Sequence, residues 1–538
     1  MSLPDPFTVI TSRPDEASLS LAELLAHRGT PLNTRCGGRG LCRGCEVEVR
    51  SGELQSLEGG EPVAAVPDRP VRACRFRALP GRPLSIAVPA RSLLRHEPAV
   101  VAEFRLGVPW AQDPLVPTAA YGAAVDVGTT TVALLLTELA TGKSLAGASS
   151  FNAQVRFGED VLTRIQRCHE NRSAVQALQK AIAAETLQPL LEEACATAGL
   201  PPAAVGVMVV AANTTMQHLL AGVDPSPLGV HPFNPVFLEH RIHSPGDLGL
   251  VFGGPGAVVH LLPGPAAYVG ADLAAGVAAT GLLYREGLNL LVDVGTNGEI
   301  IAQEDGRLLG CATAAGPAFE GAGLTSGARG VRGSIERIRL EASPFVAHLG
   351  VIGGDLPPLG ICGSAYVDFL WEARRTGIIG ENGRFTAAFA ASAGDALTAD
   401  AYGRKLRLHA HGRSGPIWIS ELDIARLLQA KAAIAAGICT LLERLGRTAS
   451  QVRTLFLAGG FGLHLSLDHA IGCGLLPGFT PSQIEVVGNT SLGGAFLALN
   501  DRSALRDMEV ACARFECIEL NLEPGFEGSY IDHLLLPD

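Results

Sequence analysis

Four cysteines near the N-terminus have the residue type and spacing needed to bind a metal cluster. Three of them follow the pattern C-x5-C-x2-C in a stretch rich in Gly and Arg, and a fourth comes after 28 intervening residues. The four are Cys36, Cys42, Cys45 and Cys74. A glycine-rich loop lets backbone N–H groups approach the sulfur atoms and tune the reduction potential of a cluster. The pattern therefore predicts a metal site held by these four thiolates.

A four-cysteine zinc site is the alternative, because it needs the same number of ligands. Structural zinc sites usually pair two short C-x2–4-C knuckles, whereas this stretch has one, between Cys42 and Cys45. The five-residue gap that follows Cys36 is similar to the gap in adrenodoxin-like 2Fe-2S ferredoxins. The spacing therefore favours iron–sulfur over zinc.

A second kind of chemistry is indicated by the pattern Asp-x-Gly-Thr, which occurs at Asp126 and again at Asp293. In both places apolar, β-branched runs flank the glycine, which predicts a β-hairpin. Each turn would collect a carboxylate, backbone N–H groups and hydroxyl groups, and this donor set suits a phosphate with its Mg²⁺. Two copies in one chain predict two related lobes that face each other across a nucleotide-binding cleft.

Two glycine-rich stretches could complete a nucleotide site. Residues 314–325 contain Gly316 and lead into an expected helix at Phe319–Glu320, whose N-terminus would suit phosphate. Glu320 is a candidate for orienting the attacking water, or else a first-turn carboxylate stabilised by the helix dipole. The buried strand that starts at Thr454 ends in Gly459 and Gly460. This strand end either leaves room for a flat adenine or is an ordinary strand-to-helix turn.

These residues need elements that position them. A strand at Phe7–Ile10, a helix at Leu19–His27 and a strand at Glu46–Arg50 fit a β-grasp ferredoxin fold around the cysteine loop. The stretch from Leu93 to Tyr121 contains four prolines and little apolar periodicity, which predicts a semi-rigid linker. The linker is either a tether for a moving electron carrier or a passive spacer.

After the first hairpin the apolar spacing alternates between helix and strand patterns. The expected elements are a helix at Val175–Ala198, a strand at Val205–Val210, a helix after Asn213 with its polar N-terminus toward the cleft, a buried helix containing Asp272, an inserted hairpin within residues 380–415 and a long helix at Ile424–Leu445. His218, in the helix after Asn213, is expected to have a structural role.

Composition excludes several classes of protein. The 538 residues are too many for one core, and 47% hydrophobic with 18% charged residues describes a well-packed globular chain. The net charge of −11 argues against a nucleic-acid binder. We expect no membrane span and, since Met1–Thr11 lacks an apolar signal core, a cytoplasmic protein. The other eight cysteines lack cluster spacing and are expected to be buried thiols.

The paired hairpins and the late Ala-Gly-Gly-Phe-Gly stretch resemble the superfamily of actin, sugar kinases and heat-shock chaperone ATPases. Together with an N-terminal 2Fe-2S domain, the chain resembles a narrower group, the ATP-dependent reductive activators of corrinoid proteins. The most specific matching segments are residues 213–216, 315–321, 361–364, 457–462 and 474–477. The resemblance implies an α+β β-grasp ferredoxin domain, a linker and an α/β actin-like (RNase H-like) ATPase of two lobes.

The resemblance also implies a reaction. The cluster takes an electron from a low-potential donor and passes it to the Co(II) of an inactivated corrinoid protein, which restores Co(I) for methyl transfer while ATP is hydrolysed. On this hypothesis Asp126 and Asp293 position Mg²⁺. The residues expected to contact the nucleotide are Gly128, Thr129, Thr130, Gly295, Thr296, Asn297, Gly298, Gly316, Gly459 and Gly460. The family resemblance further suggests a homodimer.

The expected domains are residues 1–92 for the ferredoxin, 93–120 for the linker, 121–285 for the first lobe and 286–538 for the second lobe. Two other functions remain open. The protein could be an ATP-dependent donor of low-potential electrons to another acceptor enzyme, or it could be a ferredoxin fused to a module that senses nucleotide without hydrolysing it.

Overall fold

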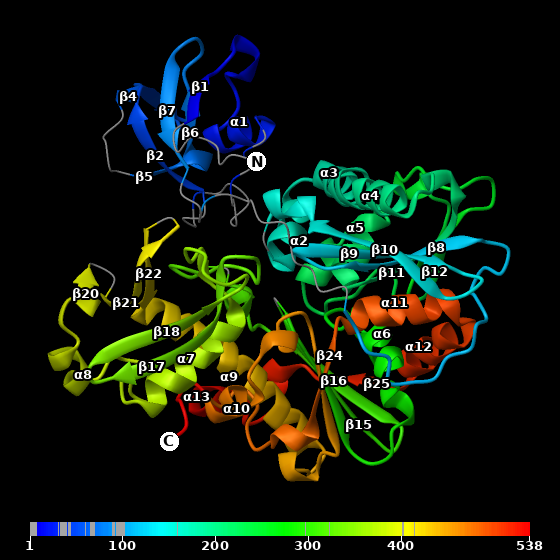
Figure 1. The fold of residues 1–538 in the computed structure, drawn as a ribbon. Coiled ribbons are helices and arrows are strands. Elements are labelled where there is room, and N and C mark those ends of the chain that lie inside the picture. The colour runs from blue at the N-terminus through cyan, green and yellow to red at the C-terminus, as the bar shows by residue number, and fades with distance from the viewer. Residues whose placement is uncertain are drawn as a thin grey trace. The chain divides into compact units, whose positions relative to one another are not determined.

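The computed structural model describes residues 8–28, 45–59, 61–64, 70–88, 103–158, 160–295, 297–321, 323–400, 403–413 and 415–538, together with residues 30, 32, 40 and 92. The chain divides into two compact units (Figure 1). The first contains Met1–Glu97 and Ala153–Glu170, and the second contains Pro98–Asn152 and Asn171–Asp538. Each unit is described separately below.

The N-terminal part of the first unit is a small α+β fold. A four-stranded sheet has the order β1-β7-β2-β5 and a three-stranded sheet has the order β4-β3-β6. The strands are β1 (Thr8–Thr11), β2 (Glu46–Ser51), β3 (Glu53–Ser56), β4 (Val63–Ala64), β5 (Pro70–Arg72), β6 (Phe76–Ala78) and β7 (Pro83–Ala87). Helix α1 (Leu21–His27) starts at a capping box made by Ser20 and Glu23, and its buried leucines join the core of β2 and β7. The expected first strand, helix and Glu46–Arg50 strand are confirmed.

Two further helical segments, within Ala153–Glu170, form part of the same compact unit as Met1–Glu97. They are a 3₁₀ turn, η4 (Ala153–Arg156), and helix α2 (Val161–Glu170). The fully buried Arg164 ties them together, because its guanidinium donates to the Gly158 carbonyl at 2.9 Å and to Gln154 Oε1 at 3.0 Å. In sequence this segment lies inside the expected first lobe, and nothing in its composition predicted that it groups with residues 1–97.

The second unit contains two six-stranded sheets. The first has the order β10-β9-β8-β11-β13-β12 and the second has the order β24-β23-β14-β15-β16-β25. The first consists of β8 (Tyr121–Val127), β9 (Thr131–Glu138), β10 (Lys143–Phe151), β11 (Val205–Ala212), β12 (Arg241–His243) and β13 (Val258–Leu261). The second consists of β14 (Asn289–Val294), β15 (Gly298–Glu304), β16 (Arg307–Thr313), β23 (Thr454–Ala458), β24 (Ile484–Gly488) and β25 (Phe515–Cys517).

Both Asp-x-Gly-Thr stretches form the expected antiparallel hairpins. In the first, β8 pairs with β9 so that Asp126 is opposite Ala133, and in the second β14 pairs with β15 so that Asp293 is opposite Glu299. Each aspartate strand also has a parallel neighbour, β11 for β8 and β23 for β14. Because parallel strands end at the same edge of a sheet, the loops after β11 and β23 lie beside the two hairpin turns.

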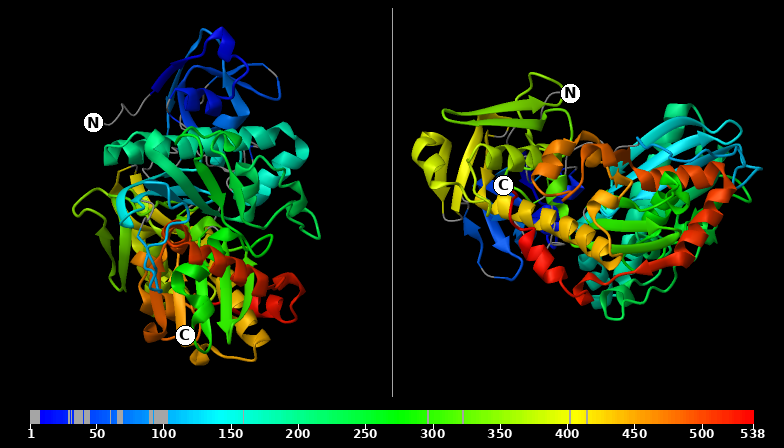
Figure 2. Two further views of the ribbon diagram at one scale, coloured as in Figure 1. Left: turned by 90° about the vertical axis from the view of Figure 1, so that its right-hand side faces the viewer. Right: turned by 90° about the horizontal axis from the view of Figure 1, so that it is seen from below.

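Helices cover the first sheet and fill the space between the two sheets. Outside lie α3 (Ser173–Ile182), a π-helical turn η5 (Ala183–Leu187), α4 (Gln188–Ala198) and α5 (Thr214–Leu220). Between the sheets lie α6 (Ala271–Thr280), α11 (Thr490–Asn500) and α12 (Arg502–Arg514) (Figure 1, Figure 2). The expected Val175–Ala198 helix is thus three consecutive helical pieces.

Helices α11 and α12 lie within residues 286–538, the expected second lobe, and part of their apolar surface packs on the first sheet. Leu492, Phe496 and Met508 pack into one core with Val207 and Val209 of β11, in the first sheet. Periodicity shows that a helix has an apolar side, but it does not show which sheet that side will cover. The sequence therefore could not predict that α11 and α12 pack on the first sheet.

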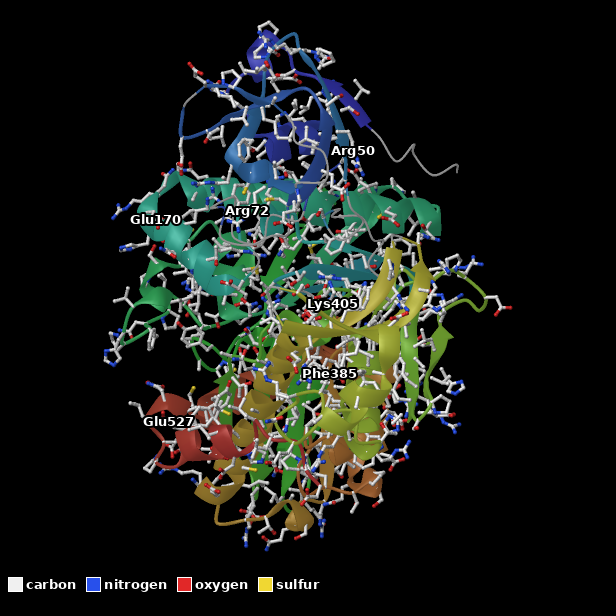
Figure 3. All side chains as sticks on the ribbon, turned by 90° about the vertical axis from the view of Figure 1, so that its left-hand side faces the viewer. Arg50, Arg72, Glu170, Phe385, Lys405 and Glu527 are labelled. Atoms are coloured by element: carbon white, nitrogen blue, oxygen red, sulfur yellow. The ribbon has the colours of Figure 1, made fainter. Side chains whose placement is uncertain are left out.

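The remaining strands form two further three-stranded sheets, β18-β17-β19 and β20-β21-β22, and helices lie between and after these strands in the chain. They are β17 (Ser334–Ala342), β18 (Phe345–Val351), β19 (Gly360–Ile361), α7 (Gly363–Arg375), α8 (Ala387–Ser392), β20 (Leu397–Asp400), β21 (Gly403–Gly412), β22 (Gly415–Ser420), α9 (Glu421–Arg444), α10 (Leu467–Gly472) and α13 (Phe526–Asp532). Figure 3 shows Lys405 on the β20–β22 sheet, where its ammonium lies 5.1 Å from the ring of Trp418. The hairpin expected within residues 380–415 is instead part of this three-stranded sheet, β20-β21-β22.

Helix α9 confirms the expected long apolar helix. Within the described residues it is the one helix with the length and hydropathy to cross a membrane, and 78% of its apolar window is buried inside the protein. Burial of this kind is typical of the core helix of a globular protein.

The second half of the expected linker packs against the second unit. Phe104 and Trp110 contact the ring of Phe496, and Gly107 N–H donates to the Ala279 carbonyl at 2.8 Å. Asp113 N–H donates to the Asn500 carbonyl at 3.0 Å. Residues 103–120 are therefore not a free tether, because their scattered apolar side chains have partners far away in the sequence. Residues 93–102, the first part of the expected linker, lie outside the described residues.

Candidate functional site

The two hairpin turns open onto one cleft of about 330 Å³ in the second unit. Of the residues predicted to contact nucleotide, Mg²⁺ or the attacking water, ten line this cleft. They are Asp126, Gly128, Thr129, Thr130, Asp293, Gly295, Asn297, Glu320, Gly459 and Gly460. The structure therefore brings together segments that are more than 300 residues apart in the chain.

Three predicted residues do not belong to this group. Gly298 lies in β15, where its carbonyl accepts a 3.0 Å hydrogen bond from Thr313 Oγ1, and Gly316 precedes the turn that contains Glu320; neither lines the cleft. Thr296 lies outside the described residues.

Asp126 is held by two donors from a distant helix. Asn489 Nδ2 donates to Asp126 Oδ2 at 2.9 Å, and Ser491 Oγ donates to Oδ1 at 2.7 Å. Burial raises the pKa of Asp126, while these two hydrogen bonds act in the opposite direction. The carboxylate is therefore fixed in orientation, and it is held where a cation would favour its ionised form.

Three more carboxyl groups line the cleft, those of Asp272 and Asp293, which are half-buried, and that of Glu299, which is buried. Burial, followed by the charge of Asp126, raises the pKa of Asp293 to about 7. Burial and then the charges of Asp293 and Asp126 raise the pKa of Asp272, and burial with the charges of Asp272 and Asp293 raises that of Glu299. This mutual repulsion is relieved when a divalent cation enters.

The chemistry of this donor set fits Mg²⁺. In the described residues no three His, Cys, Asp or Glu side chains form a ready metal-binding group. Mg²⁺ does not need one, since it keeps several waters and is usually bound by one or two carboxylates together with substrate phosphates. Asp126 and Asp293, one from each hairpin, are the residues that would hold it.

The hairpin turns use part of their own hydrogen-bonding capacity. Gly128 N–H donates to the Thr131 carbonyl at 2.9 Å, and Gly295 N–H donates to the Asn297 carbonyl at 3.0 Å. A Cβ at Gly128 would lie 2.7 Å from the Thr131 oxygen, so the turn requires glycine. The glycines therefore shape the turns, and the donors that remain for a ligand are those of neighbouring hydroxyl, amide and backbone groups.

Gly459 has a structural reason to be glycine beside Asp293. Its φ is +93°, and a Cβ there would lie 2.7 Å from the Val294 carbonyl oxygen and 3.0 Å from Asp293 Oδ1. The end of β23 therefore approaches the second aspartate closely. The adenine contact predicted for Gly459 and Gly460 stays a prediction.

Glu320 lies in a different local structure from the one expected. The expected helix is a single 3₁₀ turn, Pro317–Glu320, which is too short to provide a helix N-terminus for phosphate. The Glu320 carboxylate lies 3.7 Å from the guanidinium of Arg329, and both side chains line the cleft. Glu320 is thus placed to face a bound nucleotide, with a cation beside it.

Sequence reasoning missed the role of several polar residues at this site. Asp272 and Glu299 interrupt apolar runs, and a carboxylate in such a run is a signal that could have been used. Asn213 and Asn489 each cap a helix that follows a buried strand, α5 after β11 and α11 after β24. Asn213 Nδ2 also donates to Thr129 Oγ1 at 3.0 Å, which confirms that the polar start of α5 faces the cleft.

His218 has the expected structural role. Its Nδ1 lies 2.7 Å from the Thr214 carbonyl, its Nε2 accepts from Val236 N–H at 3.0 Å, and its ring stacks on Phe237 at 4.4 Å. Both ring nitrogens are thereby used.

Two of the four predicted cluster ligands lie in the described part of the first unit. Cys45 directly precedes β2, Cys74 lies in a 3₁₀ turn after β5, and both are buried. A hydrogen bond from the Cys74 thiol lowers the pKa of Cys45, so the two sulfur atoms are close together and favour the thiolate that a cluster needs. These two residues fit a 2Fe-2S cluster; Cys36 and Cys42 lie outside the described residues.

The fold and the cleft define a class of protein. Two sheets, each with an Asp-x-Gly-Thr hairpin at a shared cleft and with helices packed between them, form an actin-like ATPase fold of the ASKHA type. Residues 287–538 match the family model described as the C-terminal domain of RACo, the ASKHA domain. Residues 121–285 match the RACo middle region, and residues 3–79 match the 2Fe-2S iron-sulfur cluster binding domain. The chain belongs to the RACo family of reductive activators for corrinoid proteins.

Individual relatives agree with this assignment. The chain is 29% identical to the corrinoid activation enzyme RamQ of Eubacterium limosum over 99% of both chains. It is 27% identical to a Co(II) methylated amine-specific corrinoid protein reductase of Methanosarcina barkeri over 45% of this chain and 44% of that one. Among solved structures, a reductive activator for a corrinoid, iron-sulfur protein is similar with a TM-score of 0.72 and 27% identity, covering 98% of this chain and 96% of that chain. The expected fold class, a β-grasp ferredoxin followed by an actin-like ATPase, is confirmed.

Proposed function

We propose that this protein reactivates a corrinoid protein by passing one electron to Co(II), which yields Co(I), and that it couples this transfer to ATP hydrolysis. A low-potential donor supplies the electron, and ATP and water are converted to ADP and phosphate. The observation that carries the proposal is the group of four carboxyl groups that line the cleft beside two phosphate-type hairpins, on a chain that also has a 2Fe-2S domain. The names of the relatives support the choice of acceptor.

On this proposal the cleft residues bind and orient MgATP. Asp126 and Asp293 hold the Mg²⁺ or its waters, and Asn489 and Ser491 keep Asp126 correctly oriented. The hydroxyl groups of Thr129 and Thr130 and the amide of Asn297 donate to phosphate oxygens from the two opposing turns. Because the two turns belong to different sheets, a nucleotide that binds both would draw the lobes together.

Glu320 is proposed to orient the water that attacks the terminal phosphate. It lines the cleft 3.7 Å from the guanidinium of Arg329, and a carboxylate oxygen can accept a hydrogen bond from water. Replacement by Gln would keep the shape and remove the charge, so Glu320→Gln should bind nucleotide and hydrolyse it slowly.

In the first unit, the thiolates of Cys36, Cys42, Cys45 and Cys74 are proposed to hold the cluster. When bound, the 2Fe-2S cluster supplies a one-electron redox centre. The burial of Cys45 and Cys74 excludes water from two of the ligands.

Coupling to ATP has a thermodynamic purpose. Plant-type 2Fe-2S centres have potentials near about −400 mV, and Co(I) corrinoids are harder to form than such centres are to reduce. Each ~59 mV of uphill one-electron transfer lowers the equilibrium constant about tenfold. Closure of the lobes around ATP could offset several such factors by changing the complex with the corrinoid protein.

The test is an anaerobic reduction followed by absorbance. The reduced protein is mixed with a Co(II) corrinoid protein, and Co(I) is followed with ATP, without nucleotide and with a non-hydrolysable ATP analogue. Co(I) formation with ATP alone supports the proposal. An equal yield in all three samples would instead identify a ferredoxin whose second unit does not drive the transfer.

We also propose that the protein is a homodimer, as the resemblance to its family suggests. Sedimentation of the purified chain, whose mass is 55.9 kDa, would separate a dimer from a monomer at several concentrations.

A further inference from the structure

The chain crosses between its two units at an unexpected place. Strand β10 ends at Phe151, and after Asn152 the chain leaves the second unit to form η4 and α2 in the first, returning at Asn171. The unit that contains the predicted cluster ligands is therefore connected to the nucleotide cleft by this joint as well as by the segment near Glu97. The residues at the joint decide what the connection can transmit.

Asn152 is bonded directly to the first phosphate hairpin. Its backbone N–H donates to the Thr130 carbonyl at 2.9 Å, and its Nδ2 donates to the Gly128 carbonyl at 3.0 Å. The side chain is fully buried, so water does not compete for these bonds. A shift of the turn between Gly128 and Thr130 therefore moves Asn152 with it.

Phe151 is in contact with the opposite side of the cleft. The Arg329 guanidinium lies 4.5 Å from the centre of the Phe151 ring, a cation–π contact that links the loop before β17 to the end of β10. The same guanidinium lies 3.7 Å from Glu320. This ion pair is longer than a hydrogen bond, and a stronger anion could reorganise it.

Charge makes Arg329 the residue that responds to a terminal phosphate. The described lining of the cleft contains six carboxyl groups and one Arg or Lys, which is Arg329. ATP adds a further negative group that ADP lacks, and an arginine binds phosphate oxygens through paired donors. Arg329 would then turn toward the phosphate, which changes its contacts with Glu320 and Phe151 together.

We propose that Arg329 and Phe151 are positioning residues that report the terminal phosphate of ATP to the cluster-bearing unit, through the Phe151–Asn152 joint and helix α2. The inference rests on the proposed binding of ATP in the cleft. Arg329 binds the terminal phosphate, and its contact with the Phe151 ring changes as a result. The hydrogen bonds of Asn152 hold the joint to the turn at Thr130. A change in phosphate occupancy is thereby coupled to α2 without any new contact between side chains of the cleft and the cluster.

The test measures hydrogen exchange of the α2 amides, Val161–Glu170, in the full-length protein with saturating ADP and with a non-hydrolysable ATP analogue. In the wild-type protein we expect exchange to differ between the two nucleotides by about fivefold or more, and in Phe151→Leu by less than about twofold. Phe151→Tyr retains the ring and should retain the wild-type difference. Affinity for the analogue, measured in the same samples, should change less than about twofold in both Phe151 variants, since Phe151 does not line the cleft.

A second variant keeps the test decisive if Phe151→Leu does not fold. Arg329→Lys retains the charge but loses the planar group that stacks on the ring, so the exchange difference should also disappear. Equal exchange with both nucleotides in the wild type, or an undiminished difference in Phe151→Leu or Arg329→Lys, overturns the inference. The measurement needs no corrinoid protein. A wild-type exchange difference without Co(I) formation would therefore reject the proposed reaction but still support the proposed role of the Phe151–Asn152 joint.

Discussion

Asn489 donates a 2.9 Å hydrogen bond to the carboxylate of Asp126, although the two residues are 363 positions apart in the chain. Asn489 begins α11, which packs on the strand that carries Asp126, while the preceding strand β24 belongs to the other sheet. One residue thus connects the cleft carboxylate of the first hairpin to the segment that joins the two sheets. Changes in the position of Asp126 are therefore expected to accompany changes in the angle between the lobes.

Removing one donor to Asp126 should weaken catalysis more than folding. In Ser491→Ala the 2.7 Å bond to Oδ1 is lost, and a hydrogen bond to a charged group contributes about 1.5–3 kcal/mol. We expect kcat/KM for ATP hydrolysis to fall about tenfold or more. Steady-state phosphate release measures this, with Ser482→Ala, in a 3₁₀ turn outside the cleft, as the matched control. Equal rates in the two variants would show that Ser491 does not position Asp126.

The buried carboxyl groups predict an unusual dependence of stability on pH. The pKa of Asp293 is raised from 3.8 to about 7, so between these values the native state binds a proton that the unfolded chain has released. The free energy of unfolding of the nucleotide-free protein should therefore decrease as pH rises from about 4 to 7, by at most about 4 kcal/mol from this group. Urea unfolding at pH 5.5 and at pH 8 measures this decrease in the free energy of unfolding, because the first pH lies below and the second above a pKa of about 7.

Two comparisons isolate the contribution of Asp293. Asp293→Asn should flatten the dependence and raise stability at pH 8, because it removes the buried charge, while it abolishes ATP hydrolysis. Saturating Mg²⁺ with a nucleotide should also flatten the dependence in the wild-type protein, since the cation favours the ionised carboxylates. The same slope in Asp293→Asn and wild type would mean that other groups cause it.

The sequence predicted the hairpins because their signal is local: two β-branched runs around one Gly-Thr turn specify strands, turn and polar side chains together. It also predicted the long helix α9 and a helix after Asn213 with a polar N-terminus. It failed where the answer depends on packing between distant segments. Phe104 and Trp110 looked like isolated apolar residues in a proline-containing linker, and α11 looked like any apolar helix. Likewise, the raised pKa values of Asp272 and Glu299 come first from burial and then from neighbouring carboxyl groups, and both causes exist only in the folded chain.

The close approach of Gly459 to the second hairpin should make this position intolerant of any side chain. Gly459→Ala places a Cβ 2.7 Å from the Val294 oxygen and requires an L-residue at a φ of +93°, which costs about 1–3 kcal/mol. The displaced Asp293 should also lower the affinity for MgATP. Thermal unfolding and nucleotide titration test both effects, with Gly528→Ala in α13 as the control, because a Cβ there meets no atom within 4 Å. A variant with wild-type stability would show that β23 can move away from Asp293 at little cost.

Loss of one cluster ligand should separate the two activities of the chain. Cys74→Ser removes a buried thiolate beside Cys45, so we expect the purified protein to lose its visible iron–sulfur absorption and its ability to form Co(I). ATP hydrolysis should persist, because every residue proposed to bind MgATP lies in the second unit. Cys517→Ser, at an exposed cysteine of β25, is the control for the loss of a thiol as such. If Cys74→Ser retained full iron content and Co(I) formation, the cluster would have to be held by other residues. If instead hydrolysis disappeared together with the absorption, the ATPase cleft would depend on an intact cluster-bearing unit, which is a tighter coupling than independent units predict.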